Sequence, residues 1–186
     1  MSDTDIINTA QQDINGISKK RRILSLVLYI VITAVLTQID QITKYIAEQR
    51  LYNKPDFVII KDVIHLTYLR NNGSAFGMFS GKINAFLVLT VIMICLITYV
   101  VLKMPLIIKY IPVYITCILL AAGAIGNFID RVRFGYVRDF IYFKIINFPV
   151  FNVADCYVTV SVIIFIILIL FVYKNEDDFA FLSLKK

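Results

Sequence analysis

The sequence contains very few of the residues on which many soluble enzymes rely for catalysis. Among its 186 residues are one histidine, His65, three cysteines and no tryptophan. Structural and catalytic zinc sites usually draw several Cys or His ligands, and a Ser-His-Asp triad needs a histidine beside its serine. We therefore expect neither kind of site. The cysteines Cys95, Cys117 and Cys156 are odd in number and scattered, so they offer no disulfide framework and no metal-binding spacing.

Charged residues are also scarce. Only 17% of the residues are charged and 59% are hydrophobic, whereas soluble domains have about 25% and 45–50%. The formal net charge of +6 is dispersed along the chain and interrupted by acids. Nucleic-acid binding would need a concentrated basic face. The composition thus indicates a membrane protein and no nucleic-acid partner.

The hydrophobic residues are grouped in four runs: Ile23–Ile39, Ile83–Leu102, Tyr110–Ile129 and Ala154–Tyr173. A helix needs about 20 apolar residues to cross the hydrocarbon core of a bilayer. The runs are apolar throughout, whereas strands of a membrane barrel alternate apolar and polar residues. We predict an all-α membrane protein, with a four-helix transmembrane bundle forming a single domain over residues 23–173.

A polar arm, residues 1–22, precedes the first run and ends in the basic block Lys19-Lys20-Arg21-Arg22. The arm lacks clear periodicity, and we expect it to be disordered or only locally ordered. No cleavage site of the A-x-A type follows the run before Asp40, so the first helix should be retained. The basic block favours a cytoplasmic N-terminus. After four crossings the tail, residues 174–186, should be cytoplasmic too.

Two extramembrane loops, about 45–82 and 131–152, should then lie together on the side opposite the termini. In the first loop Phe57–Leu69 alternates and is rich in Val, Ile and Thr, which predicts one or two β-strands. The turn Asn71-Asn72-Gly73 follows. We expect a small β-rich cradle on the outer face of the membrane.

Polar residues gather at the helix ends on this side. They are Asp40, Asn127, Asp130, Asn152 and Asp155, with Asp139 in the connection between the last two helices. Two carboxyl groups held close together cannot both ionise cheaply, so one keeps a proton. Such a pair supplies a base that activates water and an acid that protonates a leaving amine, which are the two roles of peptide hydrolysis. By spacing alone, Asp130 and Asp155 are the favoured pair, since each stands three residues after an asparagine.

Other interpretations explain the same residues. Interfacial Asp and Asn often cap helices or bind basic side chains. Asp40 and Lys44 have the i, i+4 spacing of an ion pair, and Asp130 is followed by Arg131. A pathway for a polar substrate or an ion would also gather polar groups at membrane depth. The residues alone leave catalysis, structure and transport open.

Four sequence blocks, in this order, resemble the motifs of bacterial lipoprotein signal peptidase, also called signal peptidase II. The blocks are Asp40-Gln41-Ile42-Thr43-Lys44, Asn71-Asn72-Gly73-Ser74-Ala75-Phe76, Gly123–Arg131 together with Gly135–Phe140, and Phe148–Asp155. The resemblance covers about residues 23–173. It implies an aspartic endopeptidase of the bacterial inner membrane, with its active site on the outer face. Its substrates would be prolipoproteins bearing a diacylglyceryl cysteine, cut on the N-terminal side of that cysteine. Membrane lipids would surround it, it would act as a monomer, and it would need no metal or organic cofactor.

The resemblance also implies the roles of individual residues. The catalytic pair falls on Asp139 and Asp155, against the pair favoured by spacing. The positions that line the site or hold the substrate are Asn71, Gly73, Asn127, Arg131 and Asn152, and the structural positions are Asp40, Lys44 and Asp130.

The chain departs from the family pattern at Arg138, where an apolar residue is usual. We expect Arg138 to point outward without harm, although it could instead lower the pKa of Asp139. Cys156, next to Asp155, is expected to be a passive neighbour, although a nucleophilic pair with His65 is conceivable.

Overall fold

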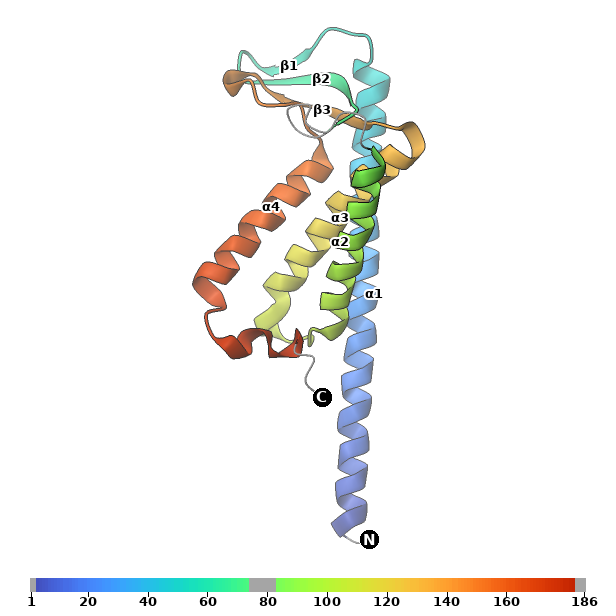
Figure 1. Ribbon diagram of the computed structural model, residues 1–186, viewed down its shortest axis with the longest axis vertical. Coiled ribbons are helices and arrows are strands. Elements are labelled where there is room, and N and C mark those ends of the chain that lie inside the picture. Colours follow the sequence, from blue (N-terminus) through green and yellow to red (C-terminus); the bar gives the residue numbers. More distant parts are fainter. Residues whose placement is uncertain (1–2, 74–82, 183–186) are drawn as a thin grey trace.

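The computed structural model describes residues 3–73 and 83–182. Four long helices form a bundle, and a three-stranded sheet lies across one end of it (Figure 1). Within the described residues, four helices are long and apolar enough to cross a membrane. The predicted class, a four-helix membrane bundle with a small β-rich part, is confirmed.

Each apolar run lies in one helix. The helices are α1 (Asp3–Leu51), α2 (Ile83–Lys103), α3 (Ile111–Phe134) and α4 (Val153–Ile167), and a π-helical segment, η4 (Leu168–Val172), continues α4. Short 3-10 turns precede α3 (η2, Ile108–Tyr110) and follow the third strand (η3, Lys144–Ile146). The last described element is η5 (Glu176–Leu182), beneath the bundle.

Some predicted boundaries are wrong. Because α1 begins at Asp3, the N-terminal arm is helical rather than disordered. It also continues past Ile39 to Leu51, and α3 continues past Ile129 to Phe134, so both helices extend beyond the apolar runs that predicted them. A helix forms its backbone hydrogen bonds internally and can continue from lipid into water. An apolar run therefore marks the part of a helix inside the membrane and does not mark its ends.

The sheet contains β1 (Phe57–Ile60), β2 (Ile64–Asn71) and β3 (Val137–Phe143), paired antiparallel in the order β1-β2-β3. The first two strands come from the first loop and β3 from the second. Their pairing confirms that both loops lie at one end of the bundle, and Figure 1 shows the start of α1 and η5 away from the sheet. The register sets Leu69 opposite Asp139 and Asn71 opposite Val137.

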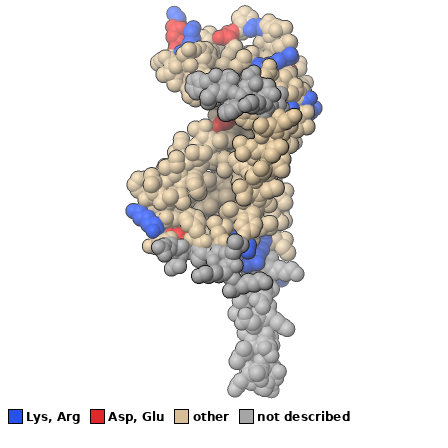
Figure 2. Space-filling model, in the orientation of Figure 1, with Lys and Arg blue, Asp and Glu red and all other residues tan. Residues whose placement is uncertain are grey.

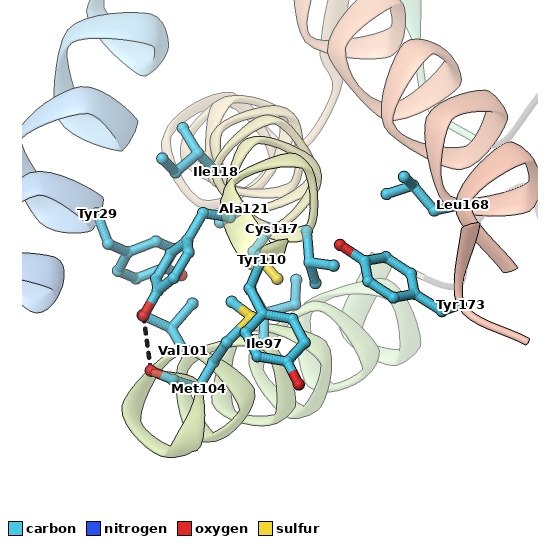
Figure 3. Packing of buried hydrophobic residues seen from close by; sticks show 12 residues of the cluster. Tyr29, Ile97, Val101, Met104, Tyr110, Cys117, Ile118, Ala121, Leu168 and Tyr173 are labelled. Atoms are coloured by element: carbon cyan, nitrogen blue, oxygen red, sulfur yellow. Dashed lines mark hydrogen bonds between the residues drawn. The ribbon is translucent and has the colours of Figure 1, made fainter. Parts of the chain in front are cut away.

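Helix α3 is the most buried of the four spans and contacts each of the others. Small residues let its neighbours approach: a Cβ on Gly123 would lie 2.5 Å from the Ala154 carbonyl oxygen in α4. In Figure 3, Tyr29 of α1, Val101 of α2 and Tyr173, which follows η4, lie around α3. Tyr114 donates a hydrogen bond of 2.7 Å to the Met104 carbonyl oxygen, which ties α3 to the end of α2.

A belt of exposed apolar side chains surrounds the bundle. Figure 2 shows charged side chains near the two ends of the bundle and very few between them. The exposed apolar residues include Ile30, Leu89, Leu96 and Phe171. In lipid this exposure costs nothing, so the bundle is held together by α3 packing and by polar groups at its ends.

Candidate active site

A cavity of about 720 Å³ lies where the bundle meets the sheet. Its polar lining comes from the end of β2, from α3, from β3 and from the start of α4. These residues are Asn71, Gly73, Asn127, Arg131, Asp139, Asp155, Cys156 and Thr159. The rest of the wall is mostly apolar and includes Val150, Val158 and Val160. The structure thus brings together both carboxyl groups that the resemblance singled out, and four of the five residues expected to support them.

Asp139 points from β3 into this cavity and is only 1% exposed. Its carboxyl oxygens accept hydrogen bonds from the side-chain amides of Asn71, at 2.8 Å, and Asn152, at 2.6 Å. Burial, and then the charge of Asp155, raise the pKa of Asp139 to about 7. The two amide donors and the more distant Lys44 act in the opposite direction and only partly offset this rise.

Asp155 is the third residue of α4 and belongs to its cap. The backbone N–H of Asn152 donates to Asp155 Oδ2 at 3.1 Å, and the N–H of Asp155 donates to Asn152 Oδ1 at 3.0 Å. This reciprocal arrangement is a capping box, which satisfies N–H groups that the first turn of a helix leaves unpaired. Asn127 Nδ2 donates to the other oxygen, Asp155 Oδ1, at 2.8 Å.

Asn152 connects the two carboxyl groups. Its side chain is completely buried, and Nδ2 donates to Asp139 Oδ1 and to Asn127 Oδ1, at 2.6 and 3.0 Å. The same residue bonds Asp155 through the capping box. One asparagine therefore fixes the position of Asp155 on a helix relative to Asp139 on a strand.

Lys44 lies behind the cavity with its side chain fully buried. Its Nζ is 2.8 Å from Asp40 Oδ2, 3.7 Å from Asp130 Oδ2, and donates to Asn127 Oδ1 at 2.8 Å. Asp40 Oδ1 also accepts from the backbone N–H of Ala154, at 2.9 Å. The ion pair expected from the i, i+4 spacing is therefore present. It ties α1 to Asn127 and to the first turn of α4.

Asp130 does not pair with Asp155, so the pair favoured by spacing is wrong. Asp130 is instead bound by Arg138: Nη2 donates to Oδ1 at 2.8 Å, and Nε and the backbone N–H donate to Oδ2 at 3.1 and 2.9 Å. Gln41 donates to the same carboxyl group at 3.1 Å. The helix spacing located Asp130 correctly on α3 but gave no information about the strand that lies over it.

Arg138 is buried, at 4% exposure, so the expectation that it points outward is wrong as well. Successive side chains of a strand point to opposite faces, so Arg138 points away from Asp139 and the cavity. That face of β3 is covered rather than open to water. There the guanidinium lies 4.7 Å from the Phe134 ring centre, donates to Gln41 Oε1 at 3.0 Å and is 3.4 Å from Glu48 Oε2.

The remaining residues have simpler surroundings. Arg131 lies over the Phe86 ring, 4.9 Å from its centre, at the cavity wall. His65 belongs to the sheet, where it pairs with Tyr142 and approaches Asp56 at 3.5 Å. It is not among the residues around the cavity, so the geometry does not favour a pair with Cys156.

Among the described residues, no three His, Cys, Asp or Glu side chains are grouped as a metal ion requires. Ser74-Ala75-Phe76 of the second block lies outside the described residues.

Sequence reasoning missed two parts of this arrangement. One is Glu48, which bonds Arg138 and accepts from the Tyr68 hydroxyl at 3.0 Å. The other is Gly126, where a Cβ would lie 2.5 Å from Asp40 Oδ2. The alternation of side chains along β3 could have indicated that Arg138 lies on the face opposite Asp139. Nothing in the sequence indicated Glu48, because α1 was expected to end before it.

Residues 32–171 match the family model described as Signal peptidase (SPase) II. The chain belongs to the signal peptidase II family. One similar protein, named lipoprotein signal peptidase, comes from Caldanaerobacter subterraneus subsp. tengcongensis. It is 45% identical to this chain over 143 residues, which are 76% of this chain and 95% of the relative. Another, from Enterococcus faecalis, is 44% identical over 146 residues, or 78% and 89% of the two chains.

Two solved structures are similar as well. Both are described as bacterial membrane enzyme structures obtained by the in meso method. The one at 2.3 Å resolution has a TM-score of 0.67 and 34% identity and covers 86% of this chain and 93% of its own. The one at 1.9 Å has the same TM-score, 36% identity and coverage of 77% and 92%. Family membership makes the chain a multi-pass membrane protease of the aspartic class that removes signal peptides from prolipoproteins.

Proposed function

We propose that Asp139 and Asp155 are the catalytic pair of this peptidase. The bond that they hydrolyse is the one on the N-terminal side of the diacylglyceryl cysteine of a prolipoprotein. The observation that carries the proposal is the shared partner Asn152, which hydrogen-bonds both acids at the wall of one cavity. No such link joins Asp130 to Asp155 among the described contacts.

The two acids divide the chemistry of hydrolysis. Near neutral pH the pair holds one proton, because burial and mutual repulsion raise the pKa of Asp139 to about 7. The ionised carboxylate takes a proton from a water molecule as the water oxygen attacks the scissile carbonyl carbon. The protonated acid then gives its proton to the leaving nitrogen as the C–N bond breaks. The products are a free carboxylate on the signal peptide and a free amine on the lipid-bearing cysteine.

The supporting residues have separate roles in this proposal. Asn71, Asn127 and Asn152 orient the two carboxyl groups through the hydrogen bonds described above. Gly73 and Arg131 line the cavity beside them and would contact the peptide. Asp40, Lys44 and Asp130 act structurally, since each is completely buried behind the pair.

We propose further that the site faces the outer side of the bacterial inner membrane, with both termini in the cytoplasm. The supports are the basic residues at the arm's end and the sheet at the far end of the bundle (Figure 1). The mostly apolar cavity wall at the helix ends would let acyl chains stay in lipid while the peptide reaches the acids. A monomer suffices, because both acids belong to one chain.

The test is cleavage of a diacylglyceryl-modified prolipoprotein by the purified protein in detergent. Asp139→Asn and Asp155→Asn should each abolish cleavage while the protein stays folded and inserted. Asp62→Asn is the matched control: it lies in the β1–β2 turn at 69% side-chain exposure, and Asn tolerates its positive φ of 58°. Normal processing by both site variants would show that the pair is assigned incorrectly.

A further inference from the structure

A second cavity, of about 620 Å³, lies between the end of α1 and the sheet. Its walls are largely apolar. They are formed by Ile46, Ala47, Leu51, Pro55, Phe57, Leu66 and Phe140. Two basic side chains, Arg50 and Lys54, also line it, with Thr43 and one acid, Asp56. None of these residues lines the cavity that holds Asp139 and Asp155.

The two basic side chains have no partner within the described part of the chain. Arg50 and Lys54 are exposed, and neither side chain forms an ion pair or a hydrogen bond there. Of the nearby acids, Glu48 is bound by Arg138 and Tyr68, whereas Asp56 lines the cavity and lies 3.5 Å from His65 without pairing with either basic side chain. Two unpaired positive charges therefore border an apolar hollow, which fits a ligand with an anionic head and an apolar tail.

The position of this cavity along α1 indicates that it lies at the level of the lipid headgroups of one leaflet. Arg21 and Arg50 are on one continuous helix, and 29 residues at 1.5 Å each separate them by about 44 Å. A bilayer including its headgroup layers is about 40–45 Å thick. With Arg21 among the headgroups of one leaflet, Arg50 reaches those of the other. Below Arg50, Ile42 and Ile46 are 54% and 51% exposed, so α1 presents an apolar surface leading up to the cavity.

We propose that this cavity binds an anionic phospholipid of the leaflet on the side of the sheet. Arg50 and Lys54 would bind its phosphate and headgroup, and an acyl chain would pack along Ile46 and Thr43 of α1. Phe140 lines this cavity and directly follows Asp139 in β3. A bound lipid would thus support the strand that carries one of the two acids, from the side that the substrate does not occupy. The proposal does not depend on the catalytic roles of those acids.

The experiment is native mass spectrometry of the full chain in neutral detergent, titrated separately with phosphatidylglycerol, phosphatidylcholine and inorganic phosphate. We expect one phosphatidylglycerol to bind more tightly than phosphatidylcholine, and inorganic phosphate to bind far more weakly. Each basic residue near a membrane surface contributes about fivefold in affinity. The double variant Arg50→Gln/Lys54→Gln should therefore lose about 25-fold in affinity for phosphatidylglycerol and should lose the headgroup preference.

Two further variants decide the interpretation. Arg50→Lys/Lys54→Arg keeps both charges and should keep the preference. Lys61→Gln/Lys144→Gln removes two charges beside the sheet, in the β1–β2 turn and at the start of η3, outside the cavity, and should bind like the unaltered protein. Equal binding of both phospholipids, or an unchanged affinity in the first double variant, would overturn the proposal. Inorganic phosphate binding as tightly as phosphatidylglycerol would overturn it too, because the apolar part of the cavity would then contribute nothing.

Discussion

Replacing Asn71 by alanine tests how the surroundings of Asp139 set the pH range of the enzyme. In the unaltered protein, Asp139 loses its proton near pH 7, where its pKa lies. Above that pH both acids are charged and none is left to protonate the leaving amine, so cleavage should decline on the alkaline side. Asn71 Nδ2 donates to Asp139 Oδ2 at 2.8 Å and favours the charged form. Without this donor the carboxyl group should hold its proton to higher pH.

The size of the shift follows from the strength of the lost bond. A hydrogen bond to a charged group contributes about 1.5–3 kcal/mol, and one pKa unit corresponds to about 1.4 kcal/mol. The alkaline limb of the pH profile should therefore move upward by about 1 to 2 units. Asn152, which still donates to Asp139 Oδ1 at 2.6 Å, keeps the side chain in place in the variant.

The assay is the initial rate of prolipoprotein cleavage at limiting substrate, from pH 5 to about pH 10, with each curve scaled to its own maximum. Scaling removes any general loss of activity and leaves the position of the limb. Asn72→Ala is the control, because Asn72 is the exposed neighbour in the same turn, and its limb should stay near pH 7. A limb that stays in place in Asn71→Ala, or moves to lower pH, would refute the role given to this hydrogen bond.

Three further outcomes are expected. Arg138→Val should lower the free energy of unfolding by about 3–5 kcal/mol, because it leaves the buried Asp130 without its main partner; unfolding in detergent measures this, and the exposed Arg133→Ala should lose far less. Gly126→Ala should cost about 1–3 kcal/mol, since its Cβ would lie 2.5 Å from Asp40 Oδ2; an unchanged melting temperature would show that α1 can move aside freely. Folding raises the pKa of Asp139 from 3.8 to about 7, so the folded state binds more protons between these values and this group's contribution to stability should fall as pH rises through that window. Asp139→Asn should remove that part of the pH dependence, which comparison of unfolding curves at pH 5 and pH 8 would detect.

Local patterns were sufficient to predict the architecture. Four apolar runs gave the four helices, and the alternation of Phe57–Leu69 gave β1 and most of β2. These patterns work because a backbone in lipid must satisfy its own hydrogen bonds, and because strand and helix periods differ. The helix ends were predicted less well, because the signal used was hydrophobicity and α1 and α3 continue beyond their apolar runs into more polar sequence.

The sequence by itself determined which polar residues gather at one end of the bundle, because the order of the crossings fixes the side of each helix end. It did not determine how those residues pair. Asp130 and Asp139 are both acids near the end of α3, and only the sheet register and the turn at Gly135 direct Asp139 into the cavity and Arg138 onto Asp130. Such pairings depend on contacts between residues up to about a hundred positions apart, such as Gln41 with Arg138. Hydropathy and helical spacing describe only neighbours along the chain, so the tertiary structure alone decided which of these side chains pair.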